Sequence, residues 1–126
     1  MVLVDTDVLI WYMRGNENAY HTIEGLETFS ISAVTYMELV QGMRNKKELN
    51  NLRVALRNWN AKVVYISHEI SAKAMFLVEQ HFLSHTLELA DALIGASAVA
   101  HSLPLLTGNY KHYKVLRDVE IRNFLP

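Results

Sequence analysis

Four acidic side chains stand in unusually apolar surroundings, and their spacing suggests that they act together. Asp5 and Asp7 interrupt the apolar run VLVDTDVLI, Glu38 lies in ISAVTYMELVQG, and Asp91 lies in ELADALIGASAVA. A carboxylate is costly to remove from water unless it is paired or bound to a cation. A fourth segment, the loop LLTGNYKHY, adds polar groups with Thr107, Asn109 and His112. We therefore examine these segments as parts of one site.

Asp91 is the most informative of these acids taken alone. Between Leu89 and Ala100 it is the only strongly polar side chain, and a helix that is apolar on nearly every side is a buried helix. Near a helix N-terminus the dipole also stabilises an acid, but Glu88 lies nearer the end of this segment and suits that role better. We interpret Asp91 as a site residue.

The other acids have structural alternatives that the sequence leaves open. Glu38 could be an ordinary solvent-facing residue of an amphipathic helix, since Thr35 and Gln41 near it are also polar. Either Asp5 or Asp7 could be the N-cap of a following helix, because aspartate is a favourable cap residue.

If Asp5, Glu38 and Asp91 converge, they form a pocket of like charge. Two unit charges 4 Å apart repel by ~4 kcal/mol at an effective dielectric constant near 20. Such a pocket requires protons or cations, and oxygen-rich sites suit Mg²⁺ or Mn²⁺. A divalent cation in such a site activates water and stabilises the leaving oxygen in the hydrolysis of a phosphodiester.

Alternating strands and helices are expected to position these residues. Apolar and β-branched runs predict strands at 2–4, 29–31, 62–66, 104–107 and, near the end, within 119–124. Helical spacing and cap residues predict helices over 7–13, 17–25, 33–44, 46–59, 68–82 and 87–102, with N-caps at Ser32, Ser67 and Thr86.

This alternation predicts an α/β fold with a short parallel sheet covered on both faces. In such sheets ligands bind beyond the carboxyl ends of the strands, near a switch in strand order. Asp5 and Thr107 both follow or end a predicted strand at that edge.

Bulk properties narrow the class of protein. The 126 residues suffice for one domain, 51% of them are hydrophobic, and the absence of cysteine excludes disulfides and thiolate chemistry. No apolar run is long enough to span a membrane, and the first residues make a poor secretion signal, so the cytoplasm is the expected compartment. The net charge is −1, yet basic residues cluster at 44–57 and 111–117 and could form a local basic rim.

Taken in order, VLVDTDVLI, ISAVTYMELVQG, ADALIGASA and LLTGNYKHY resemble the PIN-domain ribonucleases, and most of all the VapC-type toxins of toxin–antitoxin pairs. The resemblance covers essentially the whole chain. It implies an α/β/α sandwich and endonucleolytic cleavage of RNA that depends on Mg²⁺ or Mn²⁺. It also implies a homodimer and a cognate antitoxin that lays a peptide across the acidic groove.

Carried over residue by residue, the resemblance assigns Asp5, Glu38 and Asp91 to the acidic metal site. Asn109 stands where the family usually has Asp or Asn and is the fourth catalytic candidate, expected with Thr107 to position waters or the metal-bound phosphate. Its lack of charge leaves the number of metal ions open. Thr107 matches the residue that supports the site, while Thr6 and Asp7 are supporting candidates. Basic residues of 44–57 and 111–117 could contact phosphates, and Tyr110, His112 and Tyr113 could stack on bases, with His112 a candidate general acid.

Two alternatives remain. The uncharged Asn109 is compatible with a PIN-like module that binds RNA without cutting it. VLVDTDVLI also resembles the Asp-x-Asp signature of haloacid-dehalogenase phosphatases, although Leu9 stands where that signature has Thr or Val. Rapid turnover of phosphate monoesters would favour the second alternative. A receiver domain is set aside because Ser67 follows the third strand where an acceptor Asp is needed.

Overall fold

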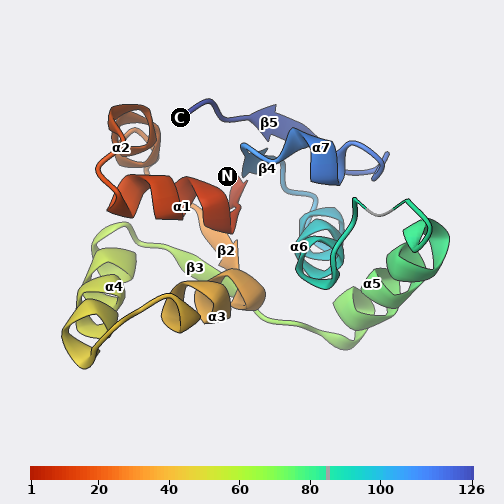
Figure 1. Ribbon diagram of the computed structural model, residues 1–126, viewed down its shortest axis with the longest axis horizontal. Helices are drawn as coiled ribbons and strands as arrows, with labels where there is room; N and C mark the ends of the chain where they lie inside the picture. Colours follow the sequence, from red (N-terminus) through yellow and green to blue (C-terminus); the bar gives the residue numbers. More distant parts are fainter. Residues whose placement is uncertain (85) are drawn as a thin grey trace.

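One parallel sheet forms the centre of the molecule. The computed structural model describes residues 1–84 and 86–126, and in these the strands lie in the order β3-β2-β1-β4-β5 (Figure 1). Each neighbouring pair is parallel, as the sequence predicts. The strand bounds are Leu3–Val4 for β1, Ser30–Ser32 for β2, Lys62–Val64 for β3, Leu105–Thr107 for β4 and Ile121–Asn123 for β5.

Strand order reverses between β1 and β4. The chain passes from β1 to β2 and β3 on one side and then returns to β4 and β5 on the other. Val4 is paired with Leu106, and the amide of Asp5 donates to the carbonyl of Leu106 at 2.9 Å. The carboxyl ends of β1 and β4 therefore lie side by side, which is the position where open α/β sheets bind ligands.

Helices cover both faces of the sheet. Their bounds are Thr6–Met13 for α1, Glu17–Glu24 for α2, Ala33–Gln41 for α3, Lys46–Asn58 for α4, His68–His81 for α5, Leu89–Ala100 for α6 and Tyr110–Tyr113 for α7. Figure 1 shows α1 to α4 on one side of the sheet and α5 and α6 on the other. This is the α/β/α arrangement that was expected.

Two apolar cores follow from the alternation of side chains along the strands. Leu3 and Leu105 pack into the core formed with α5 and α6, whereas Val4 and Leu106 pack into the core formed with α1 to α4. Successive strand residues point to opposite faces, so adjacent residues enter different cores. Even a strand of two or three residues therefore packs against the helices on both faces of the sheet.

Cap residues set several helix starts as predicted. The hydroxyl of Ser32 accepts the amide of Val34 at 3.0 Å, and that of Ser67 accepts the amide of Ile70 at 3.2 Å. The prediction that Thr86 caps the sixth helix is wrong. The N-cap is Glu88, because the side chain of Asp91 accepts the backbone amide of Glu88 and closes a capping box there.

Other differences are small. The second strand lies at Ser30–Ser32, one residue later than predicted, so Ser32 both ends the strand and caps α3. The one-turn helix α7 was not predicted within the loop after β4. Within residues 1–84 and 86–126, the structure has no helix of the length and apolar character that a membrane crossing requires.

Candidate active site

Asp5 is held at the end of β1 by two donors. Its Oδ1 accepts the backbone amide of Thr6 at 2.8 Å, which makes it the N-cap of α1. Its Oδ2 accepts the hydroxyl of Thr107, the last residue of β4, at 2.7 Å. The side chain is buried, with 3% of the residue exposed. Asp5 therefore both caps α1 and belongs to the candidate site.

Asp7 lies in the first turn of α1 and meets the chain just beyond β4. Its Oδ2 accepts the backbone amide of Gly108 at 2.9 Å. A Cβ at position 108 would lie 2.7 Å from that oxygen, so the close approach requires glycine. The other oxygen, Oδ1, is buried and has no hydrogen-bond partner among the described residues.

Glu38 reaches the same region from α3 through a threonine. Its Oε1 accepts the hydroxyl of Thr6 at 2.7 Å, and that hydroxyl lies 3.0 Å from the hydroxyl of Thr35. Glu38 itself is exposed, as the structural alternative supposed, but its carboxylate is tied to the residue next to Asp5. The structure thus brings Glu38 to the rim of the site.

Asp91 stands in the first turn of α6 and contacts α7. Its Oδ2 accepts the amide of Glu88 at 3.0 Å and lies 3.1 Å from Nδ1 of His112. The Asp91 side chain is 11% exposed, whereas the His112 side chain is 39% exposed. Asp91 therefore has the helix-terminal role that we had assigned to Glu88, and it also faces the loop after β4.

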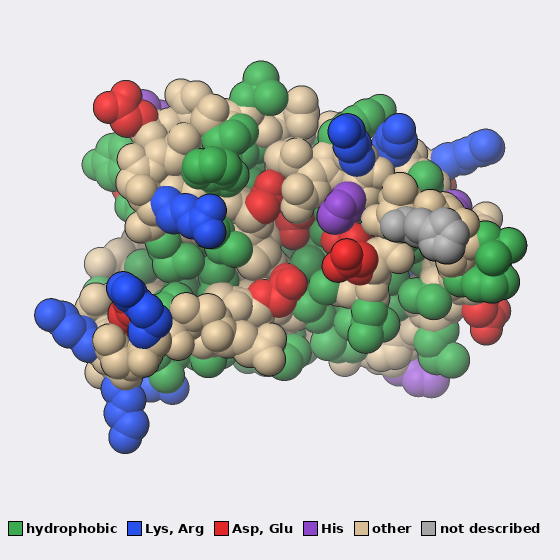
Figure 2. Space-filling view, viewed as in Figure 1, with side chains coloured by type: hydrophobic (Ala, Val, Ile, Leu, Met, Phe, Trp, Pro, Cys, Tyr) green, Lys and Arg blue, Asp and Glu red, His purple; other side chains and the backbone are tan. Residues whose placement is uncertain are grey.

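Burial raises the pKa values of Asp5, Asp7 and Asp91, and at Asp5 the charges of the other two add to the effect. Burial, followed by the charge of Asp7, raises the pKa of Asp5 to about 7. Burial is also the main cause that raises the pKa of Asp7 and of Asp91. In the described part of the chain, no Lys or Arg forms an ion pair with any of the three. Figure 2 shows acidic side chains gathered in the middle of one face, between α1, α3 and α6.

Tyr113 adds a buried hydroxyl that the sequence did not single out for this purpose. The residue is fully buried, and its hydroxyl has no hydrogen-bond partner of good geometry among the described residues. It faces the carboxyls of Asp5 and Asp91, and burial together with the charge of Asp5 raises its pKa. The prediction that Tyr113 could stack on bases is therefore wrong, since the residue is fully buried in the core formed with α5 and α6.

The loop after β4 completes the rim. The amide of Asn109 donates to the hydroxyl of Thr107 at 3.0 Å, so Thr107 links the loop to Asp5. Within the described residues, the side chain of Asn109 makes no capping hydrogen bond at the start of α7, and the residue is exposed. Tyr110 is 52% exposed and remains available for contact with a ligand.

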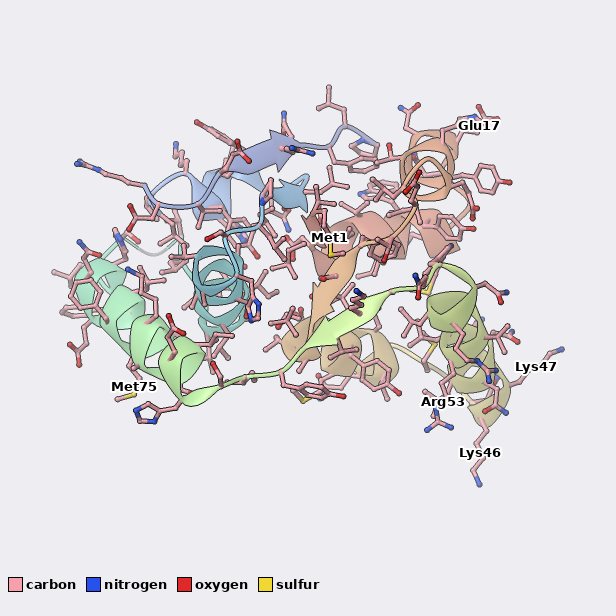
Figure 3. All side chains as sticks on the ribbon, turned by 180° about the vertical axis from the view of Figure 1, so that it is seen from behind. Met1, Glu17, Lys46, Lys47, Arg53 and Met75 are labelled. Atoms are coloured by element: carbon pink, nitrogen blue, oxygen red, sulfur yellow. The ribbon has the colours of Figure 1, made fainter. Side chains whose placement is uncertain are left out.

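A groove adjoins the acidic residues on the side of α3 and α4. It has a volume of about 930 Å³ and is lined by Glu38 together with Arg14, Arg44 and Trp59. Arg44 forms an ion pair with Glu48 at 2.8 Å. Figure 3 shows Lys46, Lys47 and Arg53 extending outward from α4. The basic residues of this segment are thus divided between the groove and the outer surface.

The donor set fits a hydrated Mg²⁺ or Mn²⁺. Among residues 1–84 and 86–126, no three His, Asp or Glu side chains are grouped closely enough to hold an ion by themselves. The donors are nevertheless hard oxygens, and Oδ1 of Asp7 and the hydroxyl of Tyr113 are buried without partners. Mg²⁺ keeps several of its waters and needs only one or two carboxylates, so these residues suit an ion bound partly through water.

Comparison with known proteins decides the family. Residues 2–117 match the model of the PIN domain. The chain belongs to the PIN domain family. The resemblance inferred from the four sequence segments is therefore confirmed.

Relatives of this PIN domain chain extend over nearly its whole length. It is 31% identical to Ribonuclease VapC10 of Mycobacterium tuberculosis, over 95% of this chain and 91% of the relative. It is 28% identical to Ribonuclease VapC1 of Methanocaldococcus jannaschii, over 96% and 85%. Among solved structures, a toxin-antitoxin complex from Klebsiella pneumoniae matches with a TM-score of 0.79 and 29% identity, covering 94% of this chain and 95% of that one.

Proposed function

We propose that this PIN domain protein is a divalent-metal-dependent endoribonuclease and the toxin of a toxin–antitoxin pair. The observation that carries the proposal is the burial of Asp5 and Asp91 at the switch point of the sheet with no Lys or Arg paired to either in the described residues. The names of the relatives, Ribonuclease VapC1 and Ribonuclease VapC10, support RNA as the substrate.

Asp5, Glu38 and Asp91 are the proposed ligands, acting directly or through water. When bound, a Mg²⁺ or Mn²⁺ ion supplies activation of a water for in-line attack on the phosphodiester and stabilises the leaving oxygen. Thr107 holds Asp5 and Thr6 holds Glu38 by hydrogen bonds of 2.7 Å each, so the carboxylates are oriented before a ligand arrives. His112 contacts Asp91 and is proposed to orient it.

The surroundings suit an extended RNA strand. The groove beside Glu38 carries Arg14 and Arg44, whose guanidinium groups recognise phosphate oxygens well. Exposed Asn109 and Tyr110 stand on the other side of the acidic residues, where an amide can bind a phosphate or base and a phenol ring can stack. We propose that the strand crosses the carboxylates between these two borders.

Partners are proposed by analogy with the relatives. The solved relative from Klebsiella pneumoniae is a toxin-antitoxin complex, and it matches this chain over 94% of its length. We propose a cognate antitoxin that covers the acidic face and inhibits cleavage. A homodimer is a further proposal, which analytical ultracentrifugation of the purified protein would test.

Incubation of the purified protein with total RNA in Mn²⁺, in Mg²⁺ and in EDTA tests the proposal, with cleavage ends mapped by sequencing. We expect new ends only with metal, and at least a hundredfold loss of rate in Asp91→Asn and Asp5→Asn. Asp118→Asn is the matched control, because Asp118 is an exposed aspartate paired with Lys73 at 3.8 Å.

Two outcomes would contradict the proposal. Full metal-dependent cleavage by Asp5→Asn would remove the assigned site. RNA binding that persists in EDTA, with no cleavage in either metal, would instead favour the binding module that the uncharged Asn109 suggests.

A further inference from the structure

The mechanism proposed above gives no role to Asp7, although this residue has the geometry of a site residue. In the described residues no basic side chain pairs with it. Its Oδ1 is buried with no partner there. A carboxylate placed this way lacks a compensating positive charge.

The end of β4 fixes Asp5 and Asp7 together. The hydroxyl of Thr107 donates to Asp5 at 2.7 Å, and the next amide, that of Gly108, donates to Asp7 at 2.9 Å. Each donor occupies one oxygen of its aspartate and, at Asp7, leaves the other unpaired. Two consecutive residues of one strand end therefore orient two carboxylates, which like-charge repulsion would otherwise separate.

A second, independent feature indicates that a ligand belongs here. The hydroxyl of Tyr113 is buried and directed at the carboxyls of Asp5 and Asp91, and it has no hydrogen-bond partner of good geometry among the described residues. Buried polar atoms are normally hydrogen-bonded, so an unpaired oxygen and an unpaired hydroxyl beside the same acids point to an absent ion or water.

We infer that Asp7 belongs, directly or through bound water, to the cation site with Asp5 and Asp91 and supplies the negative charge that Asn109 lacks. The inference rests on the proposed function, because it concerns the same divalent ion. It adds a fourth carboxylate to Asp5, Glu38 and Asp91. Asn109, exposed at the rim, is then left to contact substrate.

Binding of Mn²⁺ alone to the purified protein tests this inference, without any measurement of activity. Electron paramagnetic resonance counts free Mn²⁺ during titration of wild type, Asp7→Asn and Asp118→Asn. We expect Asp7→Asn to weaken Mn²⁺ binding at least tenfold and Asp118→Asn to change it less than twofold. Asparagine keeps an oxygen for the Gly108 amide, so the substitution removes the charge and the unpaired oxygen while leaving that hydrogen bond in place.

The melting temperature in EDTA distinguishes a metal-binding role of Asp7 from a purely structural one. If Asp7 only anchors Gly108, Asp7→Asn lowers the melting temperature in EDTA and leaves Mn²⁺ affinity intact, which would overturn the inference. If Asp7 is a ligand, Asp7→Asn melts in EDTA no lower than wild type, since repulsion is relieved, and its stabilisation by Mn²⁺ is reduced. Should Asp7→Asn fold poorly, Asp7→Ser is a second variant that removes the charge, and only its Mn²⁺ affinity is compared, because serine also loses the acceptor for the Gly108 amide.

Asp5→Asn distinguishes failure of this inference from failure of the proposed function. Loss of Mn²⁺ binding in Asp5→Asn with wild-type binding in Asp7→Asn overturns only the role of Asp7. Wild-type Mn²⁺ binding in both variants overturns the metal site itself, and the proposed metal-dependent cleavage with it.

Discussion

The hydroxyl of Thr107 donates a 2.7 Å hydrogen bond to Oδ2 of Asp5, across 102 positions of the sequence. Both residues are buried, with 0% and 3% of their surface exposed. The bond connects the ends of two adjacent strands. It stabilises the ionised form of Asp5, which burial destabilises. It is therefore a contact on which both stability and metal binding should depend.

Thr107→Val should damage both properties, whereas Thr107→Ser should restore most of each. Valine has the same shape but leaves Oδ2 of Asp5 buried without its donor, a loss of about 1–3 kcal/mol in the free energy of unfolding. We also expect at least a tenfold weaker affinity for Mn²⁺, because the ionised carboxylate is less stabilised. Urea unfolding and Mn²⁺ titration measure the two effects. Equal affinities in valine and serine variants would contradict this prediction.

The metal-free protein should become less stable as pH rises from about 4 to about 7. The pKa of Asp5 in the folded state is about 7, against an ordinary value of 3.8, so the folded state holds the proton more tightly than the unfolded state. The free energy of unfolding is therefore highest below the lower pKa and falls by up to about 1.4 kcal/mol per pH unit between the two values. Raised pKa values of Asp7 and Asp91 act in the same direction.

Urea unfolding in EDTA across this pH range measures the effect. Asp5→Asn is the informative comparison, because removal of the titrating carboxyl should flatten the dependence. Since protons compete with cations, the affinity of wild type for Mn²⁺ should rise over the same interval. A stability that rises with pH in EDTA would contradict the assigned direction of the Asp5 shift.

Thr6→Val should impair cleavage of RNA more than it impairs folding. It removes the hydroxyl that donates to Glu38 at 2.7 Å and that lies 3.0 Å from Thr35. Thr35→Val is the matched control, because it removes the same contact between the two threonines and leaves the one to Glu38. We expect both variants to lose about 1 kcal/mol of stability. Only Thr6→Val should lose activity, by about tenfold or more, and similar activities in the two variants would show that the Glu38 contact is unimportant.

Gly108→Ala should destabilise the fold through steric contact. The added Cβ would lie 2.7 Å from Oδ2 of Asp7 and 3.2 Å from the carbonyl oxygen of Phe124, so the strand end or α1 must shift. Overpacking of this kind costs about 1–3 kcal/mol. Gly42→Ala is the control, since its nearest contact would be an ordinary 3.5 Å and its φ is −82°. Thermal melts of the two variants should differ by several degrees.

Local patterns predicted much of the fold. The apolar run before Asp5, the caps at Ser32 and Ser67, and the alternation of strands and helices each depend on a few neighbouring residues, and the structure confirms them. The start of α6 was predicted wrongly because Thr86 looks like a good cap in isolation. The capping box between Glu88 and Asp91 begins the helix later.

Less of the candidate site could be predicted from the sequence, because its contacts join segments that are far apart in the chain. The sequence could nominate Asp5 and Asp91 from their apolar surroundings, but it could not show that Asp91 both caps α6 and faces His112. Tyr113 ends α7, in a segment rich in aromatic and basic residues where nothing local indicates which ring is buried. The need for glycine at position 108 depends on Asp7, which approaches from α1.

The pairing of β1 with β4 has a consequence for how the chain is made. Strand β1 leaves the ribosome first, but its neighbour β4 and the donor to Asp5 follow 102 positions later. At synthesis rates of roughly 5–20 residues per second, this interval lasts on the order of 5–20 s. A nascent chain lacks the edge on which the carboxylates assemble. The acidic site can therefore assemble only after nearly the whole chain has been synthesised.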